Sequence, residues 1–173
     1  MAGDAAANKK NSDILGPQDI SNQYLTFFLA GEEYGVSILD VQEVRVWDGV
    51  TSIPNAPVYV KGVLDLRGTI VPIVDLRIRF NMDSVEYTET TVIVVLKIKV
   101  GKQEHIIGIV VDAVSDVLDV NKDQLKDAPE FENAGNTEYI SGLATVNNKM
   151  VILLETGKLL SKSEFKSMAS IDN

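Results

Sequence analysis

The 173-residue sequence predicts a mainly β fold made of two similar small β-units, each of which could close into a barrel. Three observations favour this fold. Apolar residues alternate with polar or small residues in short runs that are bounded by turn residues, as in β-hairpins. These runs recur in the second half of the chain at a nearly constant spacing. The signal for helices is weak.

The first predicted hairpin begins at Gln23. Aromatic and aliphatic residues occupy 24, 25 and 27–29, a turn is expected at 30–33, and apolar residues then alternate with Gly35 and Ser37. A similar hairpin is expected from 91–100 through a turn at 101–104 into 105–111. The two segments resemble each other in length and in pattern.

Two constant offsets relate the halves of the chain. At an offset of 108 − 35 = 73, Gly35, Ile38, Val41, Glu43 and Val44 fall on Gly108, Val111, Val114, Asp116 and Val117. At an offset of 142 − 62 = 80, residues 62–75 fall on 142–155, with Gly62, Ile73 and Asp75 matching Gly142, Leu153 and Glu155. An internal repeat explains both offsets. The alternative, that any two hairpins share Val and Gly at turn spacing, stays open.

Helices are expected to be short. Ser37 with Asp40, and Asn121 with Gln124, have the spacing of capping boxes, and 159–168 could form a short terminal helix. Residues 120–138 are expected to connect the third and fourth hairpins. Residues 1–20 are too poor in apolar side chains to order and are expected to be a disordered tail; 21–160 form the folded domain, and 161–173 a short helix with a frayed end.

Composition excludes several classes of function. The net charge is −9 and no basic cluster is interleaved with aromatic residues, so binding to nucleic acid or to anionic lipid is disfavoured. The absence of cysteine excludes disulfides and thiolate metal sites. No apolar run reaches the roughly 18 residues of a membrane span, so we expect a cytoplasmic protein without membrane insertion.

No pattern for catalysis or for a cofactor emerges. His105 is the only histidine and lies at the start of a predicted strand, where a structural or surface role is expected. Asp112, Asp116, Asp119 and Asp123 lack the EF-hand spacing and are expected to be solvated. The chain has no GxxxxGK[ST] or GxGxxG phosphate loop. We therefore expect no enzyme, no metal and no cofactor.

The geometry of a β-hairpin does not require an arginine at position 67. It lies with Gly68 between two apolar runs, and its counterpart in the second half is Asn147. An arginine at a hairpin tip suits bidentate pairing with a carboxylate of a partner or of the chain itself, while a solvated turn arginine is the alternative. Trp47 could likewise be a core or rim aromatic, or an anchor at an interface.

From about Gln23 to Leu160 the sequence resembles a single domain of the CheW family, the adaptors of bacterial chemotaxis. The resemblance is carried by EEYGVSIL, VQEVR, IPNAPVYVKGVLDLRGTIVPIVDLR, IIGIVVDAVSDV and the APEF and YISGLA segments, in that order. It implies two five-stranded, SH3-like β-barrel subdomains without catalytic activity. It also implies two partners, the cytoplasmic hairpin tip of methyl-accepting chemotaxis receptors and the regulatory domain of the histidine kinase CheA, in membrane-associated receptor arrays.

The resemblance also assigns partner-binding residues. Carried over motif by motif, a helix-in-groove contact is expected to involve Val41, Glu43, Val44, Arg67 and Val92, with Asn55, Pro57 and Gly62 shaping nearby turns. Glu43 and Arg67 are expected to form a polar clasp. Many relatives have Asn where this chain has Asp65, which puts the hydrogen bonding at the hairpin base in question. The alternative functions are a diverged module of the same type in another receptor–kinase pathway, such as one for surface motility, and an unrecognised enzyme.

Overall fold

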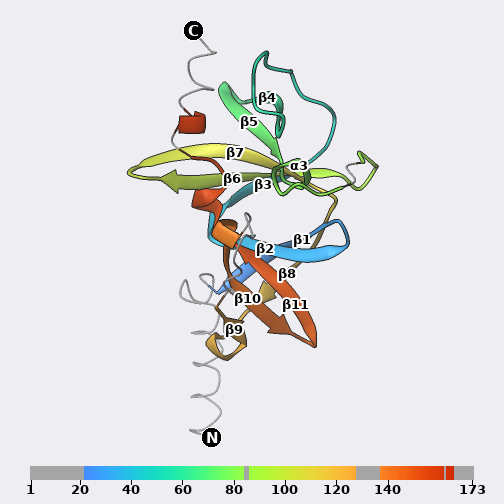
Figure 1. The fold of residues 1–173 in the computed structure, drawn as a ribbon, viewed down its shortest axis with the longest axis vertical. Helices are drawn as coiled ribbons and strands as arrows, with labels where there is room; N and C mark the ends of the chain where they lie inside the picture. The colour runs from blue at the N-terminus through green and yellow to red at the C-terminus, as the bar shows by residue number, and fades with distance from the viewer. Residues whose placement is uncertain (1–21, 84–85, 128–136, 162, 166–173) are drawn as a thin grey trace, which may run out of the picture.

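The computed structural model describes residues 22–83, 86–127, 137–161 and 163–165 and contains two curled β-sheets, one above the other in Figure 1. The six-stranded sheet has the order β8-β1-β2-β11-β10-β9, and the five-stranded sheet has the order β3-β6-β7-β5-β4. The strands of the described chain are β1 (Gln23–Leu29), β2 (Glu32–Ser37), β3 (Val41–Val46), β4 (Val60–Leu66), β5 (Thr69–Asp75), β6 (Val92–Val100), β7 (Gln103–Val111), β8 (Ala113–Asp119), β9 (Leu125–Lys126), β10 (Ile140–Val146) and β11 (Lys149–Leu154).

Helices in the described residues are one to a few turns at most, as expected. They are α3 (Leu76–Arg79) and the 3₁₀ turns η1 (Ile38–Asp40), η2 (Lys122–Gln124), η3 (Thr137–Tyr139) and η4 (Thr156–Lys158). The capping box of Asn121 and Gln124 is confirmed before η2, and Ser37 caps η1. The terminal helix expected at 159–168 is confirmed for residues 163–165, which are helical, and is wrong for Leu159 to Ser161, which are not; 162 and 166–168 lie outside the described residues. No described helix has the length and apolarity needed to span a membrane.

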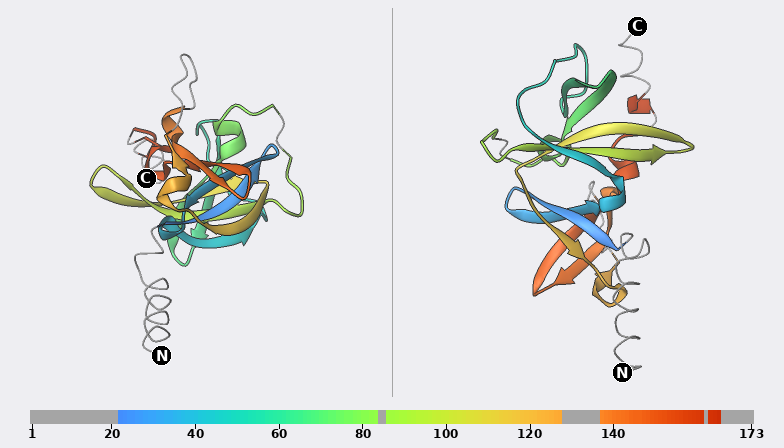
Figure 2. Two further views of the ribbon diagram at one scale, coloured as in Figure 1. Left: turned by 90° about the horizontal axis from the view of Figure 1, so that it is seen from below. Right: turned by 180° about the vertical axis from the view of Figure 1, so that it is seen from behind.

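Each sheet combines strands from both halves of the chain. The hairpin β1–β2 lies in the six-stranded sheet beside β11, while β3, β4 and β5 join the hairpin β6–β7 in the five-stranded sheet (Figure 1, and seen from behind in Figure 2, right). Without β9, the six-stranded sheet has the order β8-β1-β2-β11-β10. The repeat relates these strands in turn to β3, β6, β7, β5 and β4, which is the order of the five-stranded sheet. The expectation of five strands therefore holds for one sheet, and the two-residue β9 adds a sixth strand to the other.

The register of the central parallel pairs confirms the repeat. Gly35 of β2 lies opposite Leu153 of β11, and Gly108 of β7 lies opposite Ile73 of β5. These pairs are related by the two offsets found in the sequence. The glycines are needed for packing, because a Cβ atom added to Gly108 would lie 2.6 Å from Cδ1 of Ile73.

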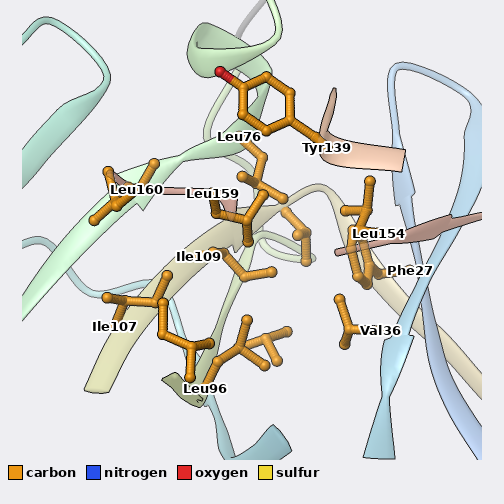
Figure 3. Close-up of a cluster of buried hydrophobic side chains, with 14 of the residues drawn as sticks. Phe27, Val36, Leu76, Leu96, Ile107, Ile109, Tyr139, Leu154, Leu159 and Leu160 are labelled. Carbon is orange, nitrogen blue, oxygen red and sulfur yellow. The ribbon is translucent and has the colours of Figure 1, made fainter. Parts of the chain in front are cut away.

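Three apolar clusters form the core. The largest lies between the sheets, where residues of both sheets and of α3 meet (Figure 3). The other two lie inside the curled sheets, around Ile73 and Val95 in the five-stranded sheet and around Val151 and Leu153 in the six-stranded sheet. Because the largest cluster is shared, the two curled sheets form a single folded unit.

The five-stranded sheet closes on itself into a barrel. Thr51, which follows β3 at one edge, bridges to Val63 of β4 at the other edge with hydrogen bonds of 3.1 and 2.8 Å. Gly62 permits this approach: its φ is 151°, and a Cβ atom at this position would lie 2.1 Å from the carbonyl oxygen of Thr51. The bridge places the segment after β3 beside the hairpin β4–β5.

Candidate functional site

Arg67 lies at the tip of the hairpin β4–β5. Leu66 pairs with Thr69, which leaves a two-residue loop in which both Arg67 (φ 53°) and Gly68 (φ 90°) have positive φ, as in a type I′ turn. Oδ1 of Asp65 accepts a hydrogen bond of 2.8 Å from the N–H of Gly68. The aspartate therefore supports the turn, which answers the question raised by its departure from the family pattern.

The backbone conformation of Arg67 is unfavourable for this residue type. The equivalent hairpin β10–β11 has Asn147 and Asn148 with φ of 52° and 65°, and asparagine tolerates this region better than arginine. A residue held in left-handed conformation against its preference is a mark of functional sites.

The guanidinium of Arg67 pairs with Glu43 of β3. Nη2 of Arg67 lies 2.8 Å from Oε1 of Glu43, and Nη1 of Arg45 lies 3.8 Å from Oε2 of the same carboxylate. The Arg67 side chain is 80% exposed and that of Glu43 is 26% exposed. The predicted clasp therefore forms within the chain, and most of the guanidinium stays available to a partner.

A hollow of about 150 Å³ lies beneath this clasp. It is bounded by side chains of β3, of the β4–β5 hairpin and of β7, namely Gln42, Glu43, Leu66, Arg67, Thr69, Val71 and Ile106. Several of these residues belong to the apolar interior of the five-stranded barrel. The pair of Glu43 and Arg67 therefore lies at the polar edge of the hollow, and apolar side chains of the barrel interior lie below it.

The predicted valines lie on β3 and on its neighbour β6. Val44 pairs with Val94 and is 44% exposed, whereas Val41 and Val92 are partly buried and pack against the core between the sheets. Val46, on the same face of β3 as Val44, is 70% exposed. Glu43 and Val44 are consecutive residues of β3, so their side chains point to opposite faces of the strand, and the exposed valines offer apolar contact area on the face opposite the clasp.

The three predicted turn residues lie between β3 and β5. Asn55 has a φ of 63°, and the carbonyl of Pro57 accepts a hydrogen bond of 2.9 Å from the N–H of Val60. Gly62 is buried and lies against the backbone of Thr51. All three shape the loop and the start of β4.

A buried ion network that the sequence analysis missed lies between the sheets. Arg77, 1% exposed, donates two hydrogen bonds of 3.0 and 2.8 Å to the fully buried Asp75, and its Nη1 lies 2.7 Å from Oδ1 of Asp112. Asp112 was expected to be a solvated residue; its side chain is 33% exposed, but it is also paired with Arg77 and accepts from the N–H of Ala30. The feature of the sequence that could have predicted the network is VDLR at 74–77, which puts opposite charges two residues apart at the end of an apolar strand.

Tyr87 connects this network to the segment after β3. Its hydroxyl donates to Asp75, the guanidinium of Arg77 lies 4.8 Å from its ring centroid, and the ring of Trp47 lies 4.6 Å away. Burial and the hydrogen bond to Asp75 raise the pKa of Tyr87 above its ordinary value. Trp47 also packs against the interior of the five-stranded barrel, as a rim aromatic would.

The described residues present no cluster suited to hold a metal ion. His105 stacks on Phe165 with 4.1 Å between ring centroids. The site defined by Glu43 and Arg67 offers an exposed ion pair beside apolar side chains.

Comparisons with known proteins agree with this picture. Residues 23–164 match the model of the CheW-like domain. The chain is 45% identical to the chemotaxis protein CheW of Klebsiella aerogenes over 173 residues, which cover 100% of this chain and 97% of the relative. It is 32% identical to a probable chemotaxis protein CheW of Rhizobium etli, over 82% and 89% of the two chains.

The fold has a relative among solved structures. The scaffolding protein TtCheW of Thermoanaerobacter tengcongensis matches with a TM-score of 0.73 and 28% identity, over 83% of this chain and 90% of that chain. The family model covers most of the sequence and the Klebsiella relative covers all of it. The chain therefore belongs to the CheW family.

Proposed function

We propose that the chain is a non-catalytic scaffold of chemotaxis signalling, which couples the cytoplasmic hairpin tips of methyl-accepting receptors to the regulatory domain of the histidine kinase CheA. It works in the cytoplasm and is recruited to membrane-associated receptor arrays. Relatives named as chemotaxis proteins and a scaffolding protein of the same fold support this proposal.

The observation that carries the proposal is the exposed Arg67, held at the hairpin tip in a conformation that disfavours it. Its pairing with Glu43 holds the guanidinium at the rim of the hollow, and Val44, the next residue, is exposed on the other face of the edge strand β3. A helix from a partner would lay its apolar face on β3 and meet the clasp with a polar side chain.

Capture of both partners tests the function. Immobilised protein is mixed with receptor-containing membranes and with purified CheA, and the bound fractions are measured. Arg67→Glu should reduce capture of at least one partner, because it places two carboxylates side by side. Lys102→Glu is the matched control, since it makes the same charge change at the tip of another hairpin, β6–β7.

The two variants separate three outcomes. Loss of capture by Arg67→Glu alone supports the proposed site. Equal loss by both variants means that only net charge matters. If the unchanged protein captures neither partner, the proposed function is rejected.

A further inference from the structure

A second hollow, of about 120 Å³, borders the core cluster between the two sheets and shares no residue with the hollow beneath the clasp. Side chains of the six-stranded sheet and of η3 form one part of its wall, and side chains that follow α3 form the other. The lining residues are Tyr34, Tyr139, Ile140, Leu154, Phe80 and Met82. We call it the aromatic hollow.

The wall of the aromatic hollow is apolar and mostly removed from water. Phe80, Tyr139 and Leu154 are 8%, 6% and 5% exposed. The ring centroids of Tyr34 and Phe80 lie 6.2 Å apart and those of Phe80 and Tyr139 lie 5.3 Å apart, so the rings line the hollow in a row. The two phenols are the only ionisable groups among the lining residues. An apolar occupant fits this place, since water would find few hydrogen-bond partners there.

The volume of the aromatic hollow limits its occupant to one ring. An apolar cavity of about 150 Å³ that is lined by aliphatic and aromatic side chains stays dry and binds benzene. The aromatic hollow is slightly smaller, so a single six-membered ring suits it better than a fused pair of rings. Neighbouring aromatic rings favour centroid distances of about 4.5–7 Å, which is the range already found along the row. A planar ring can therefore extend the row.

The internal repeat relates the aromatic hollow to a place that is closed. The counterparts of five lining residues, at the offsets of 73 and 80, are Ile107, Tyr59, Val60, Val74 and Leu160. All of them except Tyr59 are buried in the core cluster. Phe165 packs against the same cluster and stacks on His105, which shares a face of β7 with Ile107. The chain thus covers the related place with an aromatic ring of its own, which indicates the same kind of occupant for the aromatic hollow.

We propose that the aromatic hollow binds a small molecule that carries one uncharged aromatic ring. The ring of this ligand contacts Tyr34, Phe80 and Tyr139. Phe80 follows β5 and α3 of the five-stranded sheet, and Tyr139 directly precedes β10 of the six-stranded sheet, so the ligand touches both halves of the fold and stabilises the folded state. The inference is independent of the proposed function, because no step of it involves a partner protein.

The direct test is a titration with benzyl alcohol, followed by methyl signals in NMR spectra. The ring current of the bound probe should shift the methyl signals of Met82, Ile140 and Leu154, and these shifts should saturate with a Kd of about 1 mM. The methyl signals of Val71 and Ile106, in the hollow beneath the clasp, should stay in place. Shifts without saturation, or equal shifts in both hollows, would overturn the proposal.

A competitor decides whether the ring must be aromatic. Cyclohexylmethanol carries the same hydroxymethyl group on a ring that is neither planar nor aromatic. It should displace benzyl alcohol only at concentrations about tenfold higher. Displacement at equal concentrations would show that apolar volume alone matters, and the assignment to an aromatic ring would fail.

A substitution that fills the hollow assigns the binding to it. Met82→Phe places a ring in the hollow and should weaken binding of benzyl alcohol at least tenfold. Met150→Phe makes the same change at an exposed position of β11 and should leave binding unchanged. Equal affinities of the two variants would contradict the proposal.

A variant that enlarges the hollow gives a second measurement, which does not depend on the folding of Met82→Phe. Leu154→Ala removes a buried side chain from the wall, so the free variant is less stable. Benzyl alcohol should raise the melting temperature of Leu154→Ala more than that of the unchanged protein. The absence of this difference would overturn the proposal.

Phe131, which lies outside the described residues, provides the last control, because it is the aromatic residue nearest to Tyr139 in the sequence. If Phe131→Ala binds benzyl alcohol as the unchanged protein does, the hollow is open to a free ligand, as proposed. If Phe131→Ala binds the probe at least tenfold more tightly, the chain fills the hollow with its own ring, and the proposal of a free ligand fails.

Discussion

Nη1 of Arg77 lies 2.7 Å from Oδ1 of Asp112, and this contact joins the two sheets. Arg77 belongs to α3, directly after β5 of the five-stranded sheet. Asp112 uses its other oxygen to accept from the N–H of Ala30, in the β1–β2 turn of the six-stranded sheet. One arginine therefore connects two sheets that are otherwise held together mainly by apolar packing.

Removal of this arginine should strongly destabilise the fold. Arg77→Met leaves the fully buried carboxylate of Asp75 without its cation, and breaking a buried ion pair in this way costs about 3–5 kcal/mol. Urea unfolding gives the free energy of unfolding. In Arg77→Met with Asp75→Asn the loss should be smaller than in Arg77→Met alone, since no unpaired charge remains. A loss below about 1 kcal/mol for Arg77→Met would contradict the buried network.

Arg67→Asn should separate binding from stability. Asparagine occupies the equivalent position 147 at nearly the same φ, so the turn is kept while the guanidinium is lost. The exposed pair with Glu43 contributes about 0.2–1 kcal/mol, and relief of backbone strain offsets part of it. The melting temperature should hardly change. Binding to receptor or kinase should weaken about thirtyfold, which corresponds to about 2 kcal/mol for a central interface residue.

Calorimetry of the complex and thermal melting of the free variant measure these two effects. If Arg67→Asn binds as well as the unchanged protein, the clasp is not part of the interface. If it unfolds, Arg67 is a structural residue.

Gly108→Ala should destabilise the protein by overpacking, by about 1–3 kcal/mol. The added methyl group would lie 2.6 Å from Cδ1 of Ile73 and 2.8 Å from Cγ2 of Ile93. Ile73→Val removes the nearer atom and should restore part of the stability in the double variant. Gly35→Ala is the matched control at the equivalent position, where the nearest atom, of Leu153, lies 3.1 Å away, so its effect should be smaller.

Stability should fall at alkaline pH. Burial raises the pKa values of Tyr34, Tyr87 and Tyr139, so the folded state holds the phenolic protons more tightly than the unfolded state. The resulting stabilisation is complete below the ordinary tyrosine pKa of about 10 and is lost as the pH rises from there through the folded values. Urea midpoints between about pH 9 and 11 check this, and Tyr87→Phe should show a shallower decline. A midpoint that rises over this range would exclude the effect.

Folding should not depend on nucleotide or metal. Melting curves with ATP, Mg²⁺ or EDTA should coincide, because the sequence lacks a phosphate loop and the described residues hold no metal cluster. A ligand present far above its Kd would stabilise the folded state by several kcal/mol. A shift of that size would contradict the non-catalytic scaffold.

Sequence periodicity predicted the hairpins and the repeat, because both depend on local alternation and on turn residues. It could not predict that β2 pairs with β11 rather than with β5, because the pattern of apolar residues in a strand does not specify its parallel neighbour. The contact of Glu43 with Arg67 came from the family resemblance.

The buried network shows a different limit of the sequence. Asp75 and Arg77 were placed in an apolar run, but their partner Asp112 lies 112 − 77 = 35 residues further on among other acidic residues. Charged residues are mostly exposed, so a solvated aspartate was the better expectation. Only the packing of the two sheets brings these three side chains together, and it removes Asp75 and Arg77 from water while the side chain of Asp112 stays 33% exposed.

The exchange of hairpins between the sheets sets the order in which a nascent chain can complete its core. The hairpin β1–β2 leaves the ribosome first, but its parallel neighbour β11 lies at Lys149–Leu154, near the other end of the sequence. The strands β3, β4 and β5 can likewise form their sheet only after β6 and β7 have been synthesised. Residues 41–111 supply every strand of the five-stranded sheet, whereas the six-stranded sheet still needs β8, β9, β10 and β11, so the six-stranded sheet is completed last and β2 keeps an unpaired edge until β11 is made.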